Sequence, residues 1–141
     1  MEKIDSFKID HDHHPIGFYL SKVMGDIYTY DLRMKTPNGG DYLAVPALHS
    51  IEHLVATVIR NGPERDRVVY FGPMGCRTGC YLLLKGIDYD AARSLLIETL
   101  RCCLAFTEVP GAKRSECGNY LEHDLEGAKR EIKAYLVALG A

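Results

Sequence analysis

The sequence lacks an excess of charge of either sign. Its 141 residues include 17 Lys and Arg against 19 Asp and Glu, which gives a formal net charge of -2 at pH 7. Attraction to nucleic acid or to an anionic membrane needs a basic surface, and this balance gives no reason to expect one. We therefore expect neither nucleic acid nor a membrane as a partner.

Long apolar runs are missing as well. The first residues, Met1 to Ser6, contain no apolar signal core, and no later stretch approaches the about 18 apolar residues of a membrane span. Repeats, low-complexity tracts and linkers are also absent. The sequence thus predicts a cytoplasmic protein whose residues 1–141 form one domain, long enough to bury about two thirds of its unfolded surface.

The cysteines do not form an even set. They stand at positions 76, 80, 102, 103 and 117. An odd number of cysteines in a chain without a signal peptide favours reduced thiols or metal ligands over disulfides.

Apolar residues follow strand or helix periodicity in distinct segments. Strands are predicted at Gly17–Met24, Ile27–Lys35, Val68–Phe71 and Cys80–Lys85, with a hairpin at Gly25-Asp26 and a turn over Gly72–Cys76. Helices are predicted from Pro46 to Asn61, from Asp90 to Phe106 and from Asp124 to Leu139. Hairpin connections between strands, with helices in between, favour an α+β fold in which helices cover an antiparallel sheet.

The chemistry is concentrated in the helical stretch Leu48–Leu54. His49 and His53 are one turn apart, and Glu52 lies just before the second histidine. Apolar residues occupy the opposite face, so the two imidazoles can converge on one ion while the carboxylate stays free as a base. A solvated polar face is the alternative interpretation of this pattern.

Two histidines leave a catalytic metal site incomplete, because such an ion typically takes three protein ligands and keeps one position open. Cys117 lies in a polar, glycine-containing loop, Ser115–Asn119, where core packing explains a cysteine poorly. It is the candidate for the third ligand.

Five motifs stand in order along nearly the whole chain. They are Ser6–His11, Asp31–Arg33, His49–His53, Pro73–Gly79, and Cys117-Gly118 leading into His123–Ala128. In this order and at this spacing, the sequence resembles the S-ribosylhomocysteine lyase (LuxS) family. The resemblance implies cleavage of the thioether of S-ribosylhomocysteine to homocysteine and 4,5-dihydroxy-2,3-pentanedione, the precursor of autoinducer-2.

The resemblance also implies a homodimer with two identical sites at the subunit interface. Each chain would hold one divalent ion, with Fe²⁺ as the expected native metal and Zn²⁺ or Co²⁺ as substitutes. The implied metal ligands are His49, His53 and Cys117, and the implied acid/base residues are Glu52 and Cys76. Ser6, His11 and Arg33 match residues that line the ribose, and Ser6 and His11 would reach in from the partner chain.

Other polar residues have simpler interpretations. His13 and His14 are expected to be solvated, and His123 is expected to cap or hydrogen-bond at the last helix rather than to bind the ion. Arg33 can also pair with Asp31 on the polar face of its strand.

The sequence departs from the family pattern before Pro73. Tyr70 and Gly72 stand where an aspartate and a serine are expected, and Cys80 stands where an aromatic is usual. These changes leave open the alternative that the chain is a non-catalytic, metal-dependent binding protein descended from the lyase. A second alternative is a metalloprotease, because His-x-x-Glu-His is also a protease motif. The cysteine ligand and the other four motifs favour the lyase over the protease.

Overall fold

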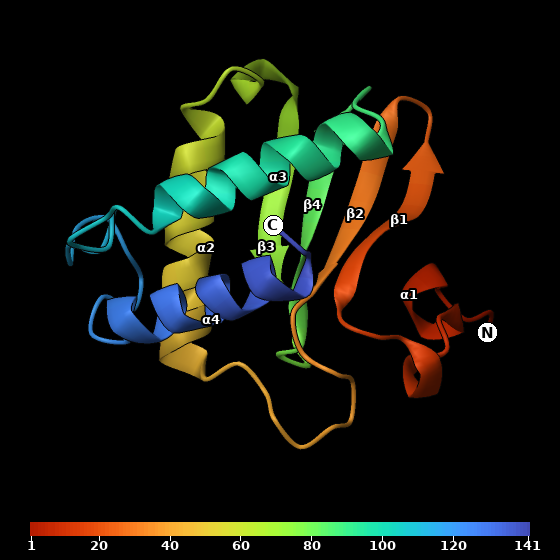
Figure 1. Cartoon of the computed structure of the whole chain (residues 1–141), viewed down its shortest axis with the longest axis horizontal. Coiled ribbons are helices and arrows are strands. Elements are labelled where there is room, and N and C mark those ends of the chain that lie inside the picture. Colours follow the sequence, from red (N-terminus) through yellow and green to blue (C-terminus); the bar gives the residue numbers. More distant parts are fainter.

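The alternating segments form one antiparallel sheet in the computed structural model, which describes residues 1–141 (Figure 1). Its strands are β1 (Gly17–Met24), β2 (Ile27–Arg33), β3 (Val68–Pro73) and β4 (Gly79–Lys85), in the spatial order β1-β2-β4-β3. Gly25, with a φ of 60°, allows the tight turn between β1 and β2. The predicted hairpin is therefore confirmed.

Three long helices cover the sheet. They are α2 (Val45–Arg60), α3 (Tyr89–Cys103) and α4 (Leu125–Ala138), and α2 contacts β3, α3 and α4. Asp88 and Asp124 cap α3 and α4, because each carboxylate accepts a backbone N–H from the first turn. The predicted α+β fold, an antiparallel sheet covered by helices, is confirmed.

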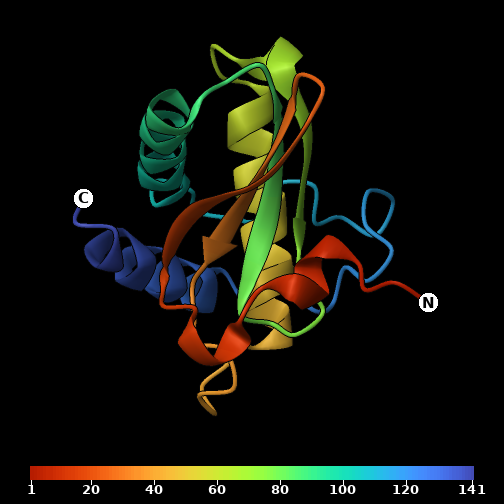
Figure 2. The ribbon, with the colours of Figure 1, turned by 90° about the vertical axis from the view of Figure 1, so that its right-hand side faces the viewer.

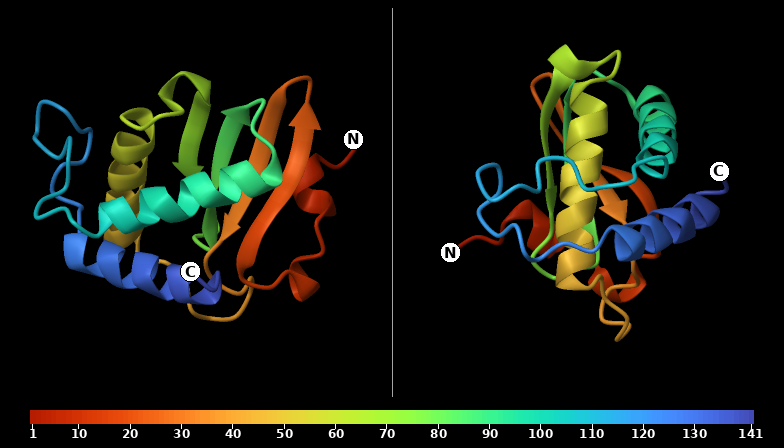
Figure 3. Two further views of the ribbon diagram at one scale, coloured as in Figure 1. Left: turned by 45° about the horizontal axis from the view of Figure 1, so that its top comes forward. Right: turned by 90° about the vertical axis from the view of Figure 1, so that its left-hand side faces the viewer.

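The first helix of the chain, α1 (Asp5–Lys8), lies on the other side of the sheet, across from α3 and α4 (Figures 2 and 3). The 3₁₀ turns are η1 (His11–His13) and η2 (Arg65–Arg67). None of the helices combines the length and apolar character that a membrane span requires.

One core joins the sheet to the three helices. Its 23 buried residues include Tyr30 and Leu82 from the strands, Leu54 from α2, Leu96 from α3 and Ile132 from α4. Each fully buried leucine-sized side chain contributes about 1.5–3 kcal/mol relative to an exposed one. This packing fixes α2, which carries the candidate metal ligands, against the rest of the molecule.

Three predicted boundaries were wrong by two or more residues. The helix predicted to reach Phe106 ends at Cys103. The strand predicted to reach Lys35 ends at Arg33, because the N–H groups of Met34 and Lys35 both donate to the carbonyl oxygen of Thr78. The turn predicted from Gly72 begins after Pro73, since β3 continues to that residue. Proline is tolerated there because β3 is an edge strand, where a missing N–H disturbs no ladder.

Candidate active site

The helix α2 presents His49, Glu52 and His53 away from its buried apolar side. Leu48, Ile51 and Leu54 are buried on that apolar side, so the polar residues one turn apart share the outer side. The two imidazole rings stand edge to face with centroids 4.8 Å apart. Glu52 is partly buried beside them.

Backbone carbonyls fix the tautomer of both histidines. The Nδ1–H of His49 donates to the carbonyl oxygen of Glu122 at 2.8 Å, and that of His53 donates to Pro110 at 2.9 Å. A carbonyl oxygen can only accept, so each Nδ1 carries the proton and each Nε2 keeps its lone pair. Such carbonyl contacts are the usual support of histidine metal ligands.

Both lone pairs converge on Cys117. The segment between α3 and α4 crosses α2 (Figure 3) and brings the Cys117 sulfur to 3.5 Å from His49 Nε2 and 3.9 Å from His53 Nε2. Tetrahedral zinc with bonds of about 2.1 Å to nitrogen and about 2.3 Å to sulfur separates those ligand atoms by about 3.6 Å. The spacing and the chemistry of these donors therefore fit a divalent ion.

His123 also lies in this cluster, whereas the sequence predicts that it caps or hydrogen-bonds at the last helix rather than binding the ion. Its Nε2 lies 3.7 Å from the Cys117 sulfur, and its ring stacks on His49 with centroids 3.9 Å apart. The ligand atoms of His49, His53, Cys117 and His123 all lie within 4.8 Å of one another.

Its hydrogen bond distinguishes His123 from the other two histidines. Nδ1 lies 3.0 Å from Ser50 Oγ, a hydroxyl that can donate or accept and so leaves the tautomer free. Ser50 Oγ also accepts the N–H of Asp124, the residue that caps α4, so His123 is linked to the start of α4 only through Ser50. Burial, reinforced by His49 and His53, lowers the pKa of His123 and favours the neutral imidazole that can ligate a metal.

A second group of predicted residues lines one cavity. Ser6, His11, Arg33 and Cys76 surround a space of about 360 Å³, together with Tyr81 and the Pro73–Gly75 segment. None of the metal-cluster residues is among its lining residues, and Glu52 is not either. Within one chain, the predicted residues thus form two separate groups.

The two cysteines near the β3–β4 turn differ sharply. Cys76 is exposed in the turn, whereas Cys80 is fully buried in β4. Burial, followed by the negative charges of Glu52 and Asp31, raises the pKa of the Cys80 thiol. Cys76 is therefore the thiol available to a substrate, and Cys80 packs as a small apolar residue.

Arg33 is almost fully buried and makes internal contacts while also lining the cavity. Its side chain is 1% exposed, and its guanidinium forms two hydrogen bonds with the Asp31 carboxylate, at 2.7 and 3.2 Å. The predicted pairing with Asp31 is present. His14, expected to be solvated, is instead 13% exposed with its Nε2 3.1 Å from an Asp31 oxygen, whereas His13 is solvated as expected.

Tyr70 and Gly72 depart from the family pattern together for a steric reason. Both belong to β3 and point to the same side, two residues apart. The Tyr70 hydroxyl lies where a side chain at position 72 would begin, so this tyrosine conformation requires glycine. The two departures act as one local change.

Comparison with known proteins agrees with this geometry. A family model described as S-Ribosylhomocysteinase (LuxS) matches residues 4–139. The S-ribosylhomocysteine lyase of Phocaeicola vulgatus is 49% identical over 143 residues, covering 96% of this chain and 89% of that protein. The enzyme of the same name from Porphyromonas gingivalis is 46% identical, over 96% and 90% of the two chains. That from Borreliella burgdorferi is 42% identical, over 99% and 93%.

Proposed function

The chain belongs to the S-ribosylhomocysteinase (LuxS) family, and on that basis we propose that it cleaves S-ribosylhomocysteine to homocysteine and 4,5-dihydroxy-2,3-pentanedione. One observation carries the proposal: the lone pairs of His49 and His53 converge on the Cys117 sulfur. That arrangement suits one divalent ion per chain in a metal-dependent lyase domain spanning residues 1–141.

His49, His53 and Cys117 would hold the ion. Fe²⁺ is the native metal in this proposal, with Zn²⁺ or Co²⁺ as substitutes, because nitrogen and sulfur ligands of this type accept all three. When bound, the ion supplies Lewis-acid stabilisation to oxygen atoms of the sugar. His123 is left outside the ligand set, so that one position stays open for the substrate.

Glu52 and Cys76 carry the protons. The thioether at C5 can leave only after the carbonyl has moved from C1 to C3, which makes the proton at C4 acidic. A carboxylate and a thiolate on either side of the sugar can pass protons between carbon and oxygen at each shift. Elimination then breaks the C5–S bond, the C4 proton is removed, and the sulfur gains a proton as homocysteine departs, without net oxidation.

The site is proposed to be shared between two subunits. Ser6, His11 and Arg33 would line the ribose, with Ser6 and His11 supplied by the partner chain. Within one chain the 360 Å³ cavity, which Ser6 and His11 line together with Arg33 and Cys76, does not include the metal cluster, so a complete site would need the cavity of one chain beside the metal cluster of its partner. Support also comes from large apolar side chains left exposed near that cavity, such as Ile4 and Phe7 at 59% and 68%, since a second subunit can cover such residues.

A cytoplasmic location completes the proposal. All five cysteines are free thiols, the state that a reducing compartment maintains.

Product analysis tests the function. Metal-loaded protein is mixed with S-ribosylhomocysteine, thiol release is followed with a thiol reagent, and the dicarbonyl product is trapped with an aromatic diamine. We expect equal amounts of thiol and trapped dicarbonyl. A folded, metal-loaded dimer that releases neither would refute the lyase function and favour the non-catalytic descendant, while cleavage of a peptide panel would favour the metalloprotease.

A further inference from the structure

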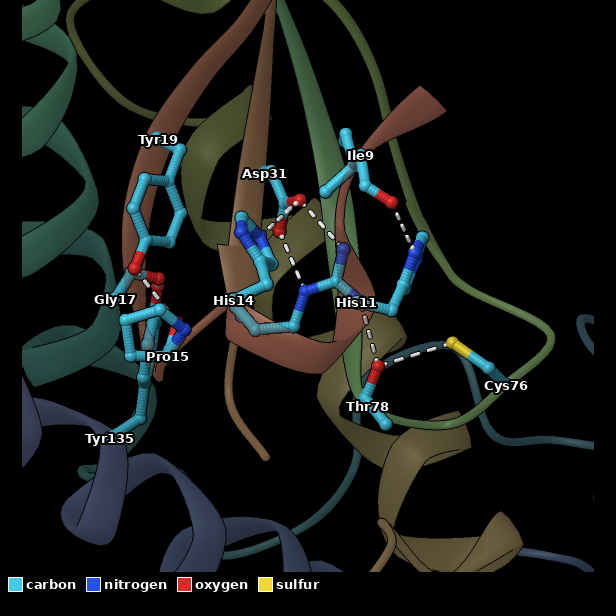
Figure 4. Close-up of polar contacts among 11 residues, drawn as sticks. Ile9, His11, His14, Pro15, Gly17, Tyr19, Asp31, Cys76, Thr78 and Tyr135 are labelled. Atoms are coloured by element: carbon cyan, nitrogen blue, oxygen red, sulfur yellow. Dashed lines mark hydrogen bonds and ion pairs between the residues drawn. The ribbon is translucent and has the colours of Figure 1, made fainter. Parts of the chain in front are cut away.

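A continuous set of hydrogen bonds joins the N-terminal segment to the exposed cysteine (Figure 4). His14 contacts the Asp31 carboxylate, Asp31 binds Arg33 through two bonds, and Arg33 reaches Thr78. Thr78 Oγ1 in turn lies 3.1 Å from the Cys76 sulfur. Asp31, Arg33 and Thr78 are each no more than 2% exposed, so water competes little for these bonds.

The direction of the last bond follows from the chemistry of arginine. A guanidinium can only donate, so Arg33 Nη1 donates to Thr78 Oγ1 at 2.9 Å. Thr78 Oγ1 has no side-chain or backbone partner other than Arg33 and Cys76. The single hydroxyl proton of Thr78 is therefore free to point at the Cys76 sulfur.

Thr78 is held in place from both ends. Its carbonyl oxygen accepts the N–H groups of Met34 and Lys35 at 2.8 and 2.9 Å. Its hydroxyl is held by Arg33, whose guanidinium is fixed by the Asp31 carboxylate. His14 Nε2 contacts Asp31 Oδ2, the oxygen that also accepts from Arg33 Nη2, and the His14 ring packs at a tilt against Tyr19 with centroids 4.5 Å apart. The donor that faces Cys76 is thus pre-arranged before any substrate arrives.

We propose that Thr78 is the positioning residue of Cys76: its hydroxyl donates to the cysteine sulfur, stabilises the thiolate and aims it into the cavity that Ser6 and His11 line. This inference rests on the proposed function for its link to turnover. A hydroxyl that already accepts from a cation is a stronger donor, because hydrogen bonds in a chain polarise one another. Hydrogen bonding to the charged form of an acid favours that form. Thr78 touches neither sugar nor metal in this proposal and acts only through Cys76.

The test compares Thr78→Val with Thr78→Ser. Valine keeps the shape but removes both the donor to Cys76 and the acceptor for Arg33 Nη1, whereas serine keeps both. Alkylation of Cys76 by iodoacetamide at pH 7 is followed by mass spectrometry of its peptide, and the exposed Cys102 serves as an internal reference. We expect alkylation of Cys76 to slow about tenfold in Thr78→Val, to stay within about twofold of wild type in Thr78→Ser, and to be unchanged at Cys102.

Turnover gives a second measurement. We expect kcat of Thr78→Val to fall about tenfold while KM stays within about twofold, because the thiolate and not the binding of substrate is affected. Thr99→Val is the control for loss of stability alone, because it also removes a buried hydroxyl, but one that lies in α3. If Thr78→Val does not fold, Thr78→Ala replaces it, since the smaller side chain adds no crowding.

Two results would overturn the inference. One is alkylation of Cys76 at the wild-type rate in Thr78→Val. The other is alkylation of Cys76 that slows as much in Thr78→Ser as in Thr78→Val. Alkylation needs no turnover, so it decides the role of Thr78 even if the wild-type protein releases no thiol from S-ribosylhomocysteine. Failure of the lyase function and failure of this inference are therefore distinguishable.

Discussion

Replacing Cys117 with alanine should remove the metal while leaving the fold intact. Cys117 is only partly buried and lies in a loop outside the sheet and the long helices. Its thiol lies within 3.9 Å of the Nε2 atoms of His49, His53 and His123. It is also the only sulfur among the candidate ligands. The substitution therefore removes a central donor at little expected cost in folding energy.

The expected loss of metal affinity follows from the roles proposed for Cys117 and His123. Loss of a residue that only orients a metal ligand typically weakens metal binding about 10- to 100-fold. Loss of a ligand should exceed that range, so Cys117→Ala is expected to weaken binding by more than about 100-fold. His123→Ala, which removes a ring stacked on His49 but no proposed ligand, should stay within about 10-fold.

Cobalt binding provides the assay. Each variant is titrated with Co²⁺ against a chelator of known affinity, and the near-ultraviolet sulfur-to-cobalt band reports whether the thiolate ligates. Cys102→Ala, which removes an exposed thiol on α3, is the matched control and should bind like wild type. Unchanged affinity in Cys117→Ala would remove Cys117 from the ligand set, and equal losses in Cys117→Ala and His123→Ala would make His123 a ligand as well.

Three further predictions concern the Asp31–Arg33 ion pair, the site shared within the dimer, and the residues Tyr70 and Gly72 of β3. Asp31→Ala leaves a buried guanidinium unpaired and should lower the free energy of unfolding by about 3–5 kcal/mol in urea titrations; a loss below about 1 kcal/mol would contradict the buried pair. Mixing inactive His11→Ala with inactive Glu52→Ala should restore part of the activity, because some mixed dimers carry one intact site, and no recovery despite mixed dimers would show that each site lies within one chain. Gly72→Ser should make the half-exposed Tyr70 side chain rotate away at a small cost in stability, and adding Tyr70→Asp should remove that cost with a coupling of about 0.5 kcal/mol; additive effects would contradict the steric link between these positions.

The sequence predicted the local elements well because their signals are local. The helix α2 has proline in its first turn and an apolar stripe of helical spacing, and both features are visible without knowledge of the fold. The spacing of His49 and His53 places them together on any helix. Cys117 is a candidate from its polar, glycine-containing loop alone, but the family resemblance was needed to assign it to these histidines, because 64 residues separate it from His53.

The missed contacts depend on tertiary structure. His14 lies in a polar terminal run that usually stays solvated, and only the folded chain brings it over the buried Asp31. His123 reaches the metal cluster because Ser50 on α2 binds both its ring and the N–H of Asp124. Its one sequence signal is a position six residues after Cys117 in the same loop, which is too weak to separate a ligand from a helix-capping residue.

The most direct test of the proposed chemistry is the rate of thiol release by Cys76→Ala beside Cys80→Ala, with both variants confirmed as folded and metal-loaded. Cys76 is exposed at the cavity, whereas Cys80 is buried in β4. Losing a proton-transfer group typically costs about 10²- to 10⁴-fold in rate, so Cys76→Ala should lose at least about 100-fold in kcat while keeping its metal. Cys80→Ala should change mainly stability. Near-normal thiol release by Cys76→Ala, or a collapse confined to Cys80→Ala, would contradict the assignment of the acid/base thiol and the mechanism built on it.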